Sequence, residues 1–110
     1  TKIQMRKGIL EFCIIGIISR GEVYAYDILD ALKNANMLVV EGTVYPLLTR
    51  LKNAGLLTYE WKESNSGPPR KYFTLTLDGQ SALDDLKGTW NELSNAVEKA
   101  SNYQKIEESN

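Results

Sequence analysis

The sequence predicts a mainly α-helical fold with a small β-hairpin, and three observations support this prediction. Apolar residues recur at helical spacing in four separate segments of the 110-residue chain. Between the third and the fourth segment, apolar and polar residues alternate in two short runs, as they do along half-buried β-strands. The segment "SNSGPP" at 64–69 separates these two runs and has the composition of a turn.

Length and composition indicate one globular domain and narrow its chemistry. Hydrophobic residues make up 43% of the chain and charged residues 25%, which are ordinary values for a folded domain. A single Cys and no His exclude an internal disulfide, a Cys/His zinc site and any triad that uses His. The chain carries no catalytic cluster, so we expect no enzyme, metal or cofactor. No apolar run reaches the roughly 20 residues of a membrane span, and the lone Cys fits a reducing cytoplasm.

The net charge of −1 hides an uneven distribution of charges. Residues 1–75 carry ten basic and seven acidic side chains, whereas residues 76–110 carry three and seven. A basic N-terminal part and an acidic C-terminal part can give a nearly neutral protein a local positive face. The overall charge therefore argues against a strongly basic nucleic-acid binder but allows a basic surface patch.

The first helical segment, residues 5–19, is apolar almost all round and includes Ile9, Phe12 and Cys13. A helix without a polar face is buried on all sides, and a chain of this size has few ways to surround one. We therefore expect a partner subunit to cover part of it, with a plain core helix or a buried strand as the alternative. Cys13 is interpreted as a small apolar filler rather than a redox sensor.

The second and third segments are amphipathic helices with marked ends. In residues 24–35 the buried stripe is Ala25, Ile28, Leu29 and Leu32, and "NAN" at 34–36 is expected to end the helix. In "GTVYPLLTRLKNAGLL" at 42–57 the stripe is Val44, Leu47, Leu48 and Leu51. Gly42 or Thr43 is expected to cap the start, so that Pro46 falls in the first turn, where Pro is tolerated. Gly55 stands where a left-handed residue ends a helix.

The outer face of the third helix is polar and carries no acid. At about 100° per residue, the side opposite the leucines presents Thr43, Pro46, Thr49, Arg50 and Asn53, with Tyr45 on its flank. Arg and Asn can recognise guanine and adenine in a DNA major groove, while Thr and Tyr more often contact phosphates. A solvated polar face is the alternative interpretation.

The two alternating runs predict a hairpin. Its apolar sides carry Leu57, Tyr59 and Trp61 on the first strand and Phe73, Leu75 and Leu77 on the second. Arg70 and Lys71 are expected close to its tip, where they would contact phosphates or form an ordinary solvated pair.

The fourth helical segment begins near Asp78 and carries a heptad seam. Its apolar residues step by three and four: Leu83, Leu86, Trp90, Leu93, Val97 and Ala100. A seam can face its own domain or a partner helix, and together with the apolar first helix we interpret it as a dimer interface. The sequence thus predicts a winged helix-turn-helix domain at 1–77, a dimerisation helix at 78–104 and a disordered polar tail at 105–110.

Three motifs, in this order, resemble the PadR family of bacterial transcriptional regulators. They are "YAYDIL" (24–29) in the second helix, "GTVYPLLTRLKNAGLL" (42–57) in the third and "GPPRKYFTLTLDG" (67–79) in the wing. Ala25 replaces the usual Gly, Asp27 the usual Glu, and Pro68 a common basic residue. The resemblance covers roughly residues 5–100, and the single C-terminal helix resembles the short subgroup of the family.

The resemblance implies a homodimeric repressor that binds a palindromic operator in double-stranded DNA. The DNA contacts would come from the second helix, the third helix and the wing: Tyr24, Thr43, Tyr45, Pro46, Thr49, Arg50, Asn53, Arg70 and Lys71. The dimer interface would come from the first and last helices: Ile9, Cys13, Leu86, Trp90, Leu93 and Val97.

Some members of the short subgroup are similar to multidrug sensors, which hold planar aromatic molecules between paired Trp residues at the dimer centre. Trp90 stands at the matching place and Phe12 at a pocket-lining position, so the resemblance implies an effector that releases DNA. The alternative for Trp90 is a seam residue that fills the dimer core. The alternative for the whole chain is a winged-helix module that binds another protein without specific DNA binding.

Overall fold

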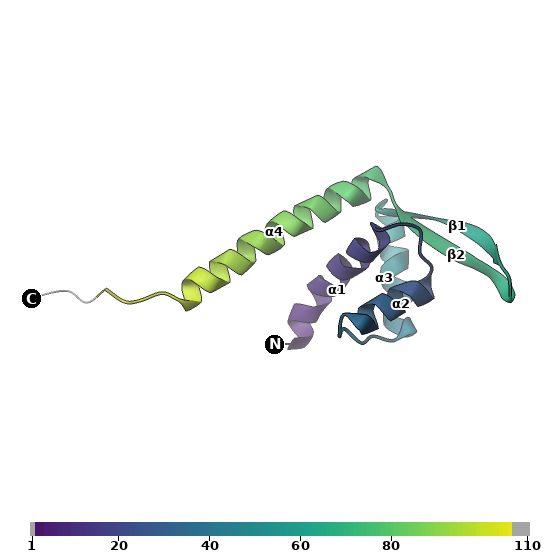
Figure 1. Cartoon of the computed structure of the whole chain (residues 1–110). Coiled ribbons are helices and arrows are strands. Elements are labelled where there is room, and N and C mark those ends of the chain that lie inside the picture. The colour runs from purple at the N-terminus through teal and green to yellow at the C-terminus, as the bar shows by residue number, and fades with distance from the viewer. Residues whose placement is uncertain (1, 107–110) are drawn as a thin grey trace, which may run out of the picture.

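The computed structural model places residues 2–106 and, apart from residues 2–4, 6 and 7, their side chains. Residues 107–110, part of the predicted disordered tail, lie outside the described residues. Along the described chain the elements are α1 (Lys2–Ile18), α2 (Ala25–Asn34), α3 (Glu41–Asn53), β1 (Leu57–Ser64), β2 (Gly67–Leu75) and α4 (Leu77–Ser101). This confirms the predicted mainly α-helical fold with a hairpin, which we call the wing (Figure 1).

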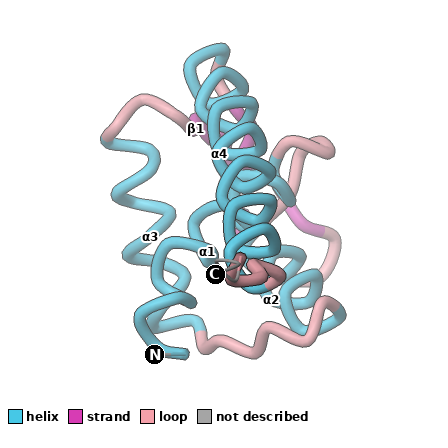
Figure 2. The backbone as a smooth tube through the Cα atoms, turned by 90° about the vertical axis from the view of Figure 1, so that its left-hand side faces the viewer, coloured by secondary structure: helices cyan, strands magenta, loops and turns pink. Residues whose placement is uncertain are grey.

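The helices α1, α2 and α3 pack together beside the wing, while α4 extends away from them (Figure 1, Figure 2). One cluster of buried apolar side chains joins these elements: Leu10, Ile14, Ile15, Ile18, Ala25, Ile28, Leu32, Val44, Leu48, Leu51, Leu57, Phe73 and Leu83. No polar side chain is buried among the described residues. The core therefore holds α3 by its leucine side and leaves the opposite side of this helix to solvent.

The helix α1 has a buried side and a half-buried side. Ile14 and Ile18 are buried, whereas Ile9, Phe12 and Cys13 are half-buried. Within one chain this helix is thus not buried on all sides, and the expected partner remains a prediction. Burial raises the pKa of the Cys13 thiol, which lowers its share of reactive thiolate and agrees with a packing role.

Residues in the left-handed conformation end α2 and α3. Gly55 follows α3 with a φ of +80°, and its N–H donates to the Lys52 carbonyl at 3.0 Å. The N–H of Leu56 donates to the Leu51 carbonyl at 3.0 Å, which completes a Schellman motif. Asn36 has a φ of +62° and plays the same part after α2. Both predicted helix ends are confirmed.

The helix α3 begins earlier than the sequence predicted. Val40 is its N-cap and Glu41 its first residue, so neither Gly42 nor Thr43 caps the helix. Glu41 suits this position, because the helix dipole favours an acid in the first turn. Pro46 consequently lies past the first turn, and its missing N–H deprives the Gly42 carbonyl of its usual helical donor.

The strands of the wing are longer than predicted. They pair antiparallel as far as Ser64 opposite Gly67, so most of the predicted turn at 64–69 belongs to the strands. Prolines are tolerated there because both strands of a two-stranded sheet are edges. Arg70 and Lys71 lie within the paired part of β2, a few positions back from the tip.

Two apolar side chains of this region are placed differently from the prediction. Trp61 shares its strand face with the buried Leu57 but is 62% exposed, because β1 extends past the core. Leu77, predicted in the second strand, is the first residue of α4 and is 90% exposed. Alternation shows which strand face a residue occupies, but not where the core beneath that face ends.

A hydrogen-bonded junction joins the start of α4 to the end of α3. The hydroxyl of Thr76, the N-cap, accepts from the Gly79 N–H at 3.0 Å and donates to the Gly55 carbonyl at 2.6 Å. The Thr76 N–H donates to the Leu56 carbonyl at 3.1 Å. Gly79 lies so close to this carbonyl that a Cβ at Gly79 would overlap its oxygen. The junction fixes the direction in which α4 leaves the domain.

The heptad seam of α4 is packed at one end and exposed at the other. Leu83 is buried in the core and Leu86 is half-buried. Trp90, Leu93 and Val97 are 49%, 57% and 66% exposed. The far half of the seam is thus largely uncovered within the described part of the chain.

Candidate nucleic-acid interface

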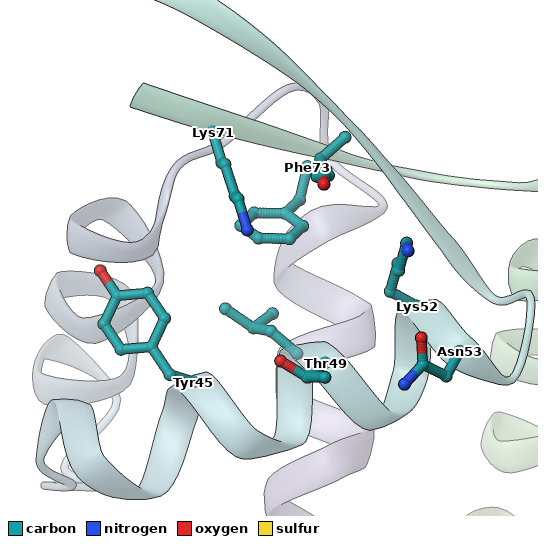
Figure 3. A pocket seen from close by; sticks show the side chains of 8 residues that line it. Tyr45, Thr49, Lys52, Asn53, Lys71 and Phe73 are labelled. Carbon is teal, nitrogen blue, oxygen red and sulfur yellow. The ribbon is translucent and has the colours of Figure 1, made fainter. Parts of the chain in front are cut away.

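The outer side of α3 faces the wing across a small hollow, which we call the α3–wing hollow. Its lining comes from α3 and from both strands of the wing: Tyr45, Leu48, Thr49, Lys52, Asn53, Tyr59, Lys71 and Phe73. Figure 3 shows Lys71 pointing from the wing toward α3, across from Tyr45 and Thr49. The lining contains two ammonium groups and no carboxylate.

Aromatic rings position the two lysines of this hollow. The Nζ of Lys71 lies 4.5 Å from the centroid of the Tyr59 ring and 5.3 Å from that of Trp61. The Nζ of Lys52 lies 5.7 Å from the same Tyr59 centroid, and Tyr59 stacks on the buried Phe73. Such contacts contribute roughly 0.5–1 kcal/mol at exposed sites. They hold the ammonium groups in place without neutralising their charge.

A second hollow, the α2–wing hollow, lies between the start of α2 and the wing. Its lining is aromatic and basic: Tyr24, Ala25, Tyr45, Trp61, Pro69, Arg70, Lys71 and Phe73. The Cζ of Arg70 lies 4.5 Å from the centroid of the Tyr24 ring. Arg70 and Lys71 contact different rings, because consecutive strand residues point to opposite faces: Arg70 lies over Tyr24, and Lys71 over Tyr59 and Trp61. Both side chains nevertheless line this hollow.

Arg50 lies on the other flank of α3. Its guanidinium forms an ion pair with the Glu11 carboxylate of α1, and 62% of its side chain is exposed. The helix face that carries no acid of its own therefore meets an acid from another helix. Thr43 and Pro46 are exposed on α3 but line neither of the two hollows. The α3–wing hollow contains three of the predicted outer-face residues: Tyr45, Thr49 and Asn53.

Three members of this surface were not predicted, although the sequence carries signals for them: Lys52, Tyr59 and Trp61. Lys52 follows Tyr45 by seven residues, which puts both on the same side of a helix. The alternation of the two strands likewise puts Tyr59 and Trp61 on the same face of the wing as Lys71.

One cation of the wing already has an acidic partner. The Nζ of Lys62 donates to the Glu22 carboxylate at 2.6 Å and lies 5.7 Å from the Tyr72 ring centroid. The hydrogen bond to Glu22 raises the pKa of Lys62. The basic character of the wing near α2 and α3 therefore comes from Arg70 and Lys71.

The two predicted effector residues lie on different helices. Phe12 packs against the core from α1, and Trp90 lies on the exposed half of α4. No group of three or more His, Cys, Asp or Glu that could hold a metal ion occurs among the residues that the structure describes. Within the same part of the chain, no helix is long and apolar enough to cross a membrane.

Comparison with known proteins finds close relatives of this arrangement. The sequence profile of the transcriptional regulator PadR-like family matches residues 14–85. The X-ray structure of a PadR-like transcription factor from Bacteroides fragilis is 55% identical to this chain, with a TM-score of 0.79. The match covers 90% of this chain and 96% of that chain.

Bacillus subtilis PadR is a more distant relative. This negative transcriptional regulator is 28% identical over 80 residues, which are 70% of this chain and 44% of that protein. The crystal structure of Bacillus subtilis PadR in complex with operator DNA is 24% identical, has a TM-score of 0.66 and covers 92% of this chain and 51% of that chain. This chain thus spans about half the length of that protein and shares its fold.

Proposed function

The chain belongs to the PadR-like family of transcriptional regulators, and we propose that it is a homodimeric repressor whose α3 helices and wings contact a palindromic operator. The α3–wing hollow carries this proposal, because two lysines and no carboxylate line it on the solvent-facing side of α3. Its volume of about 130 Å³ is below the roughly 300–1,000 Å³ of pockets for drug-sized ligands. The hollow therefore suits a phosphate group better than a separate small molecule.

The residues between α3 and the wing divide into two roles. Lys52, Lys71 and Arg70 would contact phosphates, which set affinity and register without reading sequence. Thr49 and Asn53 would face base edges in the major groove, where the Asn amide is suited to adenine. Two recognition helices related by a two-fold axis would then bind the two halves of a palindrome.

The remaining predicted contacts lie at the margin of this surface. Arg50 could reach a guanine or a phosphate only if its guanidinium leaves or shares the Glu11 carboxylate. Tyr24 lies beneath Arg70, while Thr43 and Pro46 are exposed on α3. We propose that these residues contact the DNA backbone at the edges of the interface.

Lys71→Ala is expected to weaken binding to a duplex taken from upstream of the protein's own gene by about tenfold. Each lost phosphate contact should also reduce the slope of log K against log salt by about one, hence by about two for a dimer. The measurement is fluorescence anisotropy of the labelled duplex at several NaCl concentrations.

Lys87→Ala is the matched control, because it removes the same charge from an exposed position on α4, outside both hollows. Equal losses in the two variants would assign the effect to net charge and contradict the proposed interface. If the unaltered protein shows no salt-dependent binding to the duplex, the rival function is favoured, namely a winged-helix module that binds another protein.

We propose that a second copy of the chain covers α4 and the half-buried side of α1. The exposed half of the seam carries apolar side chains at the spacing of helix–helix packing, and such patches on soluble proteins mark interaction sites. Because α1 and α4 contact each other, their apolar sides can form one surface. Six residues would make up this interface: Ile9, Cys13, Leu86, Trp90, Leu93 and Val97.

A planar aromatic effector is proposed to bind at the centre of this dimer. About half of the Trp90 surface is exposed, and two indoles related by the dimer axis could stack on both faces of a planar molecule. Phe12 would line the site from α1. An effector that separates the two wings would weaken DNA binding, and DNA would weaken effector binding by the same factor.

In Trp61→Phe, Trp90 is the only Trp of the chain, and a planar cationic dye such as ethidium is expected to quench its fluorescence with a saturable curve. A cation is the appropriate probe because residues 76–110 carry a net negative charge. The control is Trp90→Phe, in which Trp61 should show only weak, unsaturable quenching. Equal quenching in both variants would indicate general surface adsorption and contradict an effector site at Trp90.

A further inference from the structure

Trp61 is an exposed aromatic side chain outside the core, and apart from its contact with Lys71 it has no part in the interface proposed above. It lines the α2–wing hollow, and Lys71, 5.3 Å from its ring centroid, lines both hollows. The indole therefore lies where the two hollows meet. Exposing this ring gains little for folding, because the core ends before this position. Beside Arg70 and Lys71, the ring adds an apolar surface to a basic hollow.

The lining of the α2–wing hollow indicates the chemistry of its partner. Arg70 and Lys71 supply positive charge, and no carboxylate belongs to the lining. The helix α2 begins here, but the Tyr24 N–H already donates to the Asp27 carboxylate at 3.2 Å. The Asp27 carboxylate thus already occupies the start of this helix, and Arg70 and Lys71 would supply the charge that holds an anion. Aromatic faces beside two cations fit a group that is anionic on one side and apolar on the other.

We propose that Trp61 packs against a deoxyribose of the DNA backbone in the α2–wing hollow, next to the phosphate that Arg70 and Lys71 contact in the proposed function. The phosphate lies against Arg70 and Lys71, and the CH groups of the deoxyribose pack on the indole of Trp61. A single sugar–phosphate group thus contacts both the cations and the aromatic ring of the hollow. The contact adds affinity without reading sequence, and the inference rests on the proposed function.

An indirect role for Trp61 makes a different prediction. If the indole only holds Lys71 through the cation–π contact, removing it should have no effect once Lys71 is absent. A direct contact with the backbone should instead persist without Lys71. The two roles also differ in salt dependence, because the Trp61 contact carries no charge.

Trp61→Ala is expected to lower duplex affinity on the order of tenfold, the lower end of the range for losing an aromatic–base stacking contact, with an unchanged salt slope. The same loss is expected in the Lys71→Ala background. In Trp90→Phe, where Trp61 is the only Trp, a saturating unlabelled duplex is expected to protect the indole from acrylamide quenching. The upstream duplex and a random duplex of the same length should protect it equally.

Binding of the duplex without protection of Trp61 would overturn this inference and leave the proposed function intact. A loss in Trp61→Ala that disappears in the Lys71→Ala background would also overturn it and assign Trp61 to holding Lys71. No duplex binding by the unaltered protein at low salt would overturn the proposed function and this inference with it. Should Trp61→Ala fail to fold, the acrylamide measurement on Trp90→Phe still tests the inference, because that variant keeps Trp61.

Discussion

Gly79→Ala is expected to lower the free energy of unfolding by about 3 kcal/mol, a large part of the roughly 5–15 kcal/mol typical of a domain. A Cβ at Gly79 would overlap the carbonyl oxygen of Leu56. Because this oxygen belongs to the backbone, it cannot move aside as the end of a flexible side chain can. Relief requires α4 to move outward, at the expense of the 3.1 Å hydrogen bond from the Thr76 N–H to Leu56.

The loss should extend beyond this single bond. The Thr76 hydroxyl joins the Gly55 carbonyl to the Gly79 N–H, so displacing Gly79 strains the cap of α4 and its attachment to the end of α3. Overpacking typically costs about 1–3 kcal/mol, and each weakened hydrogen bond contributes about 1 kcal/mol. Since α4 carries the proposed dimer interface, the variant should also dimerise more weakly.

Gly88→Ala is the matched control for this prediction. Gly88 also lies in α4, and beyond its chain neighbours and the adjacent helix backbone no described atom lies within 4 Å of a Cβ placed there. At about 100° per residue it falls opposite the seam, so a partner helix should not touch it. Ala in place of Gly inside a helix is expected to add about 1 kcal/mol of stability. Urea unfolding followed by circular dichroism at one protein concentration measures both variants, and equal stabilities would contradict the close contact at Gly79.

Several features of this fold could be predicted from the sequence because their causes lie within a few residues. The end of α3 depends on Gly55, which adopts a positive φ, and on the apolar Leu56 that follows it. The buried side of α3 could be predicted from helical spacing. Val44, Leu48 and Leu51 are buried, in agreement with that pattern. The presence of a helix and the side that it buries are local properties of this kind.

Two features that escaped prediction depend on contacts between distant residues. Glu11 meets Arg50 because α1 and α3 pack together, and no spacing within either segment indicates this pair. Gly79 needs to be glycine because Leu56 lies against it, although its helical position alone would favour Ala. By contrast, the different ring partners of Arg70 and Lys71 could have been predicted, since consecutive strand residues point to opposite faces.

Leu93→Glu is expected to convert the protein from a dimer to a monomer at micromolar concentration and to lower operator affinity by at least about a hundredfold. Leu93 is 57% exposed in one chain, so the substitution should cost little in the fold of the monomer. In the proposed dimer the two-fold axis brings Leu93 toward apolar residues of the partner, where an unpaired carboxylate is costly to bury. The measurement is sedimentation equilibrium, followed by anisotropy with the upstream duplex.

The effect on DNA binding follows from the loss of avidity, because the two recognition helices are no longer linked in one dimer. Two linked recognition helices bind with an avidity that exceeds that of one helix by roughly 10²–10⁴, because the second contact becomes intramolecular. A monomer retains its α3–wing hollow and its charges, so it should keep weak, salt-dependent binding. The predicted variant is therefore a folded protein with weak affinity for a single half of the operator, which separates dimerisation from the chemistry of the interface.

Asn95→Glu is the matched control, since it adds the same charge to an exposed position on the opposite side of α4. It should remain dimeric and bind the duplex within a fewfold of the unaltered protein, because its carboxylate stays in water. A dimeric Leu93→Glu variant would show that the seam is not the interface and that the apolar half of α4 serves another partner. A monomer formed by the unaltered protein would contradict the homodimer itself, and the exposed Trp90, Leu93 and Val97 would then have to be explained by contact with a different chain.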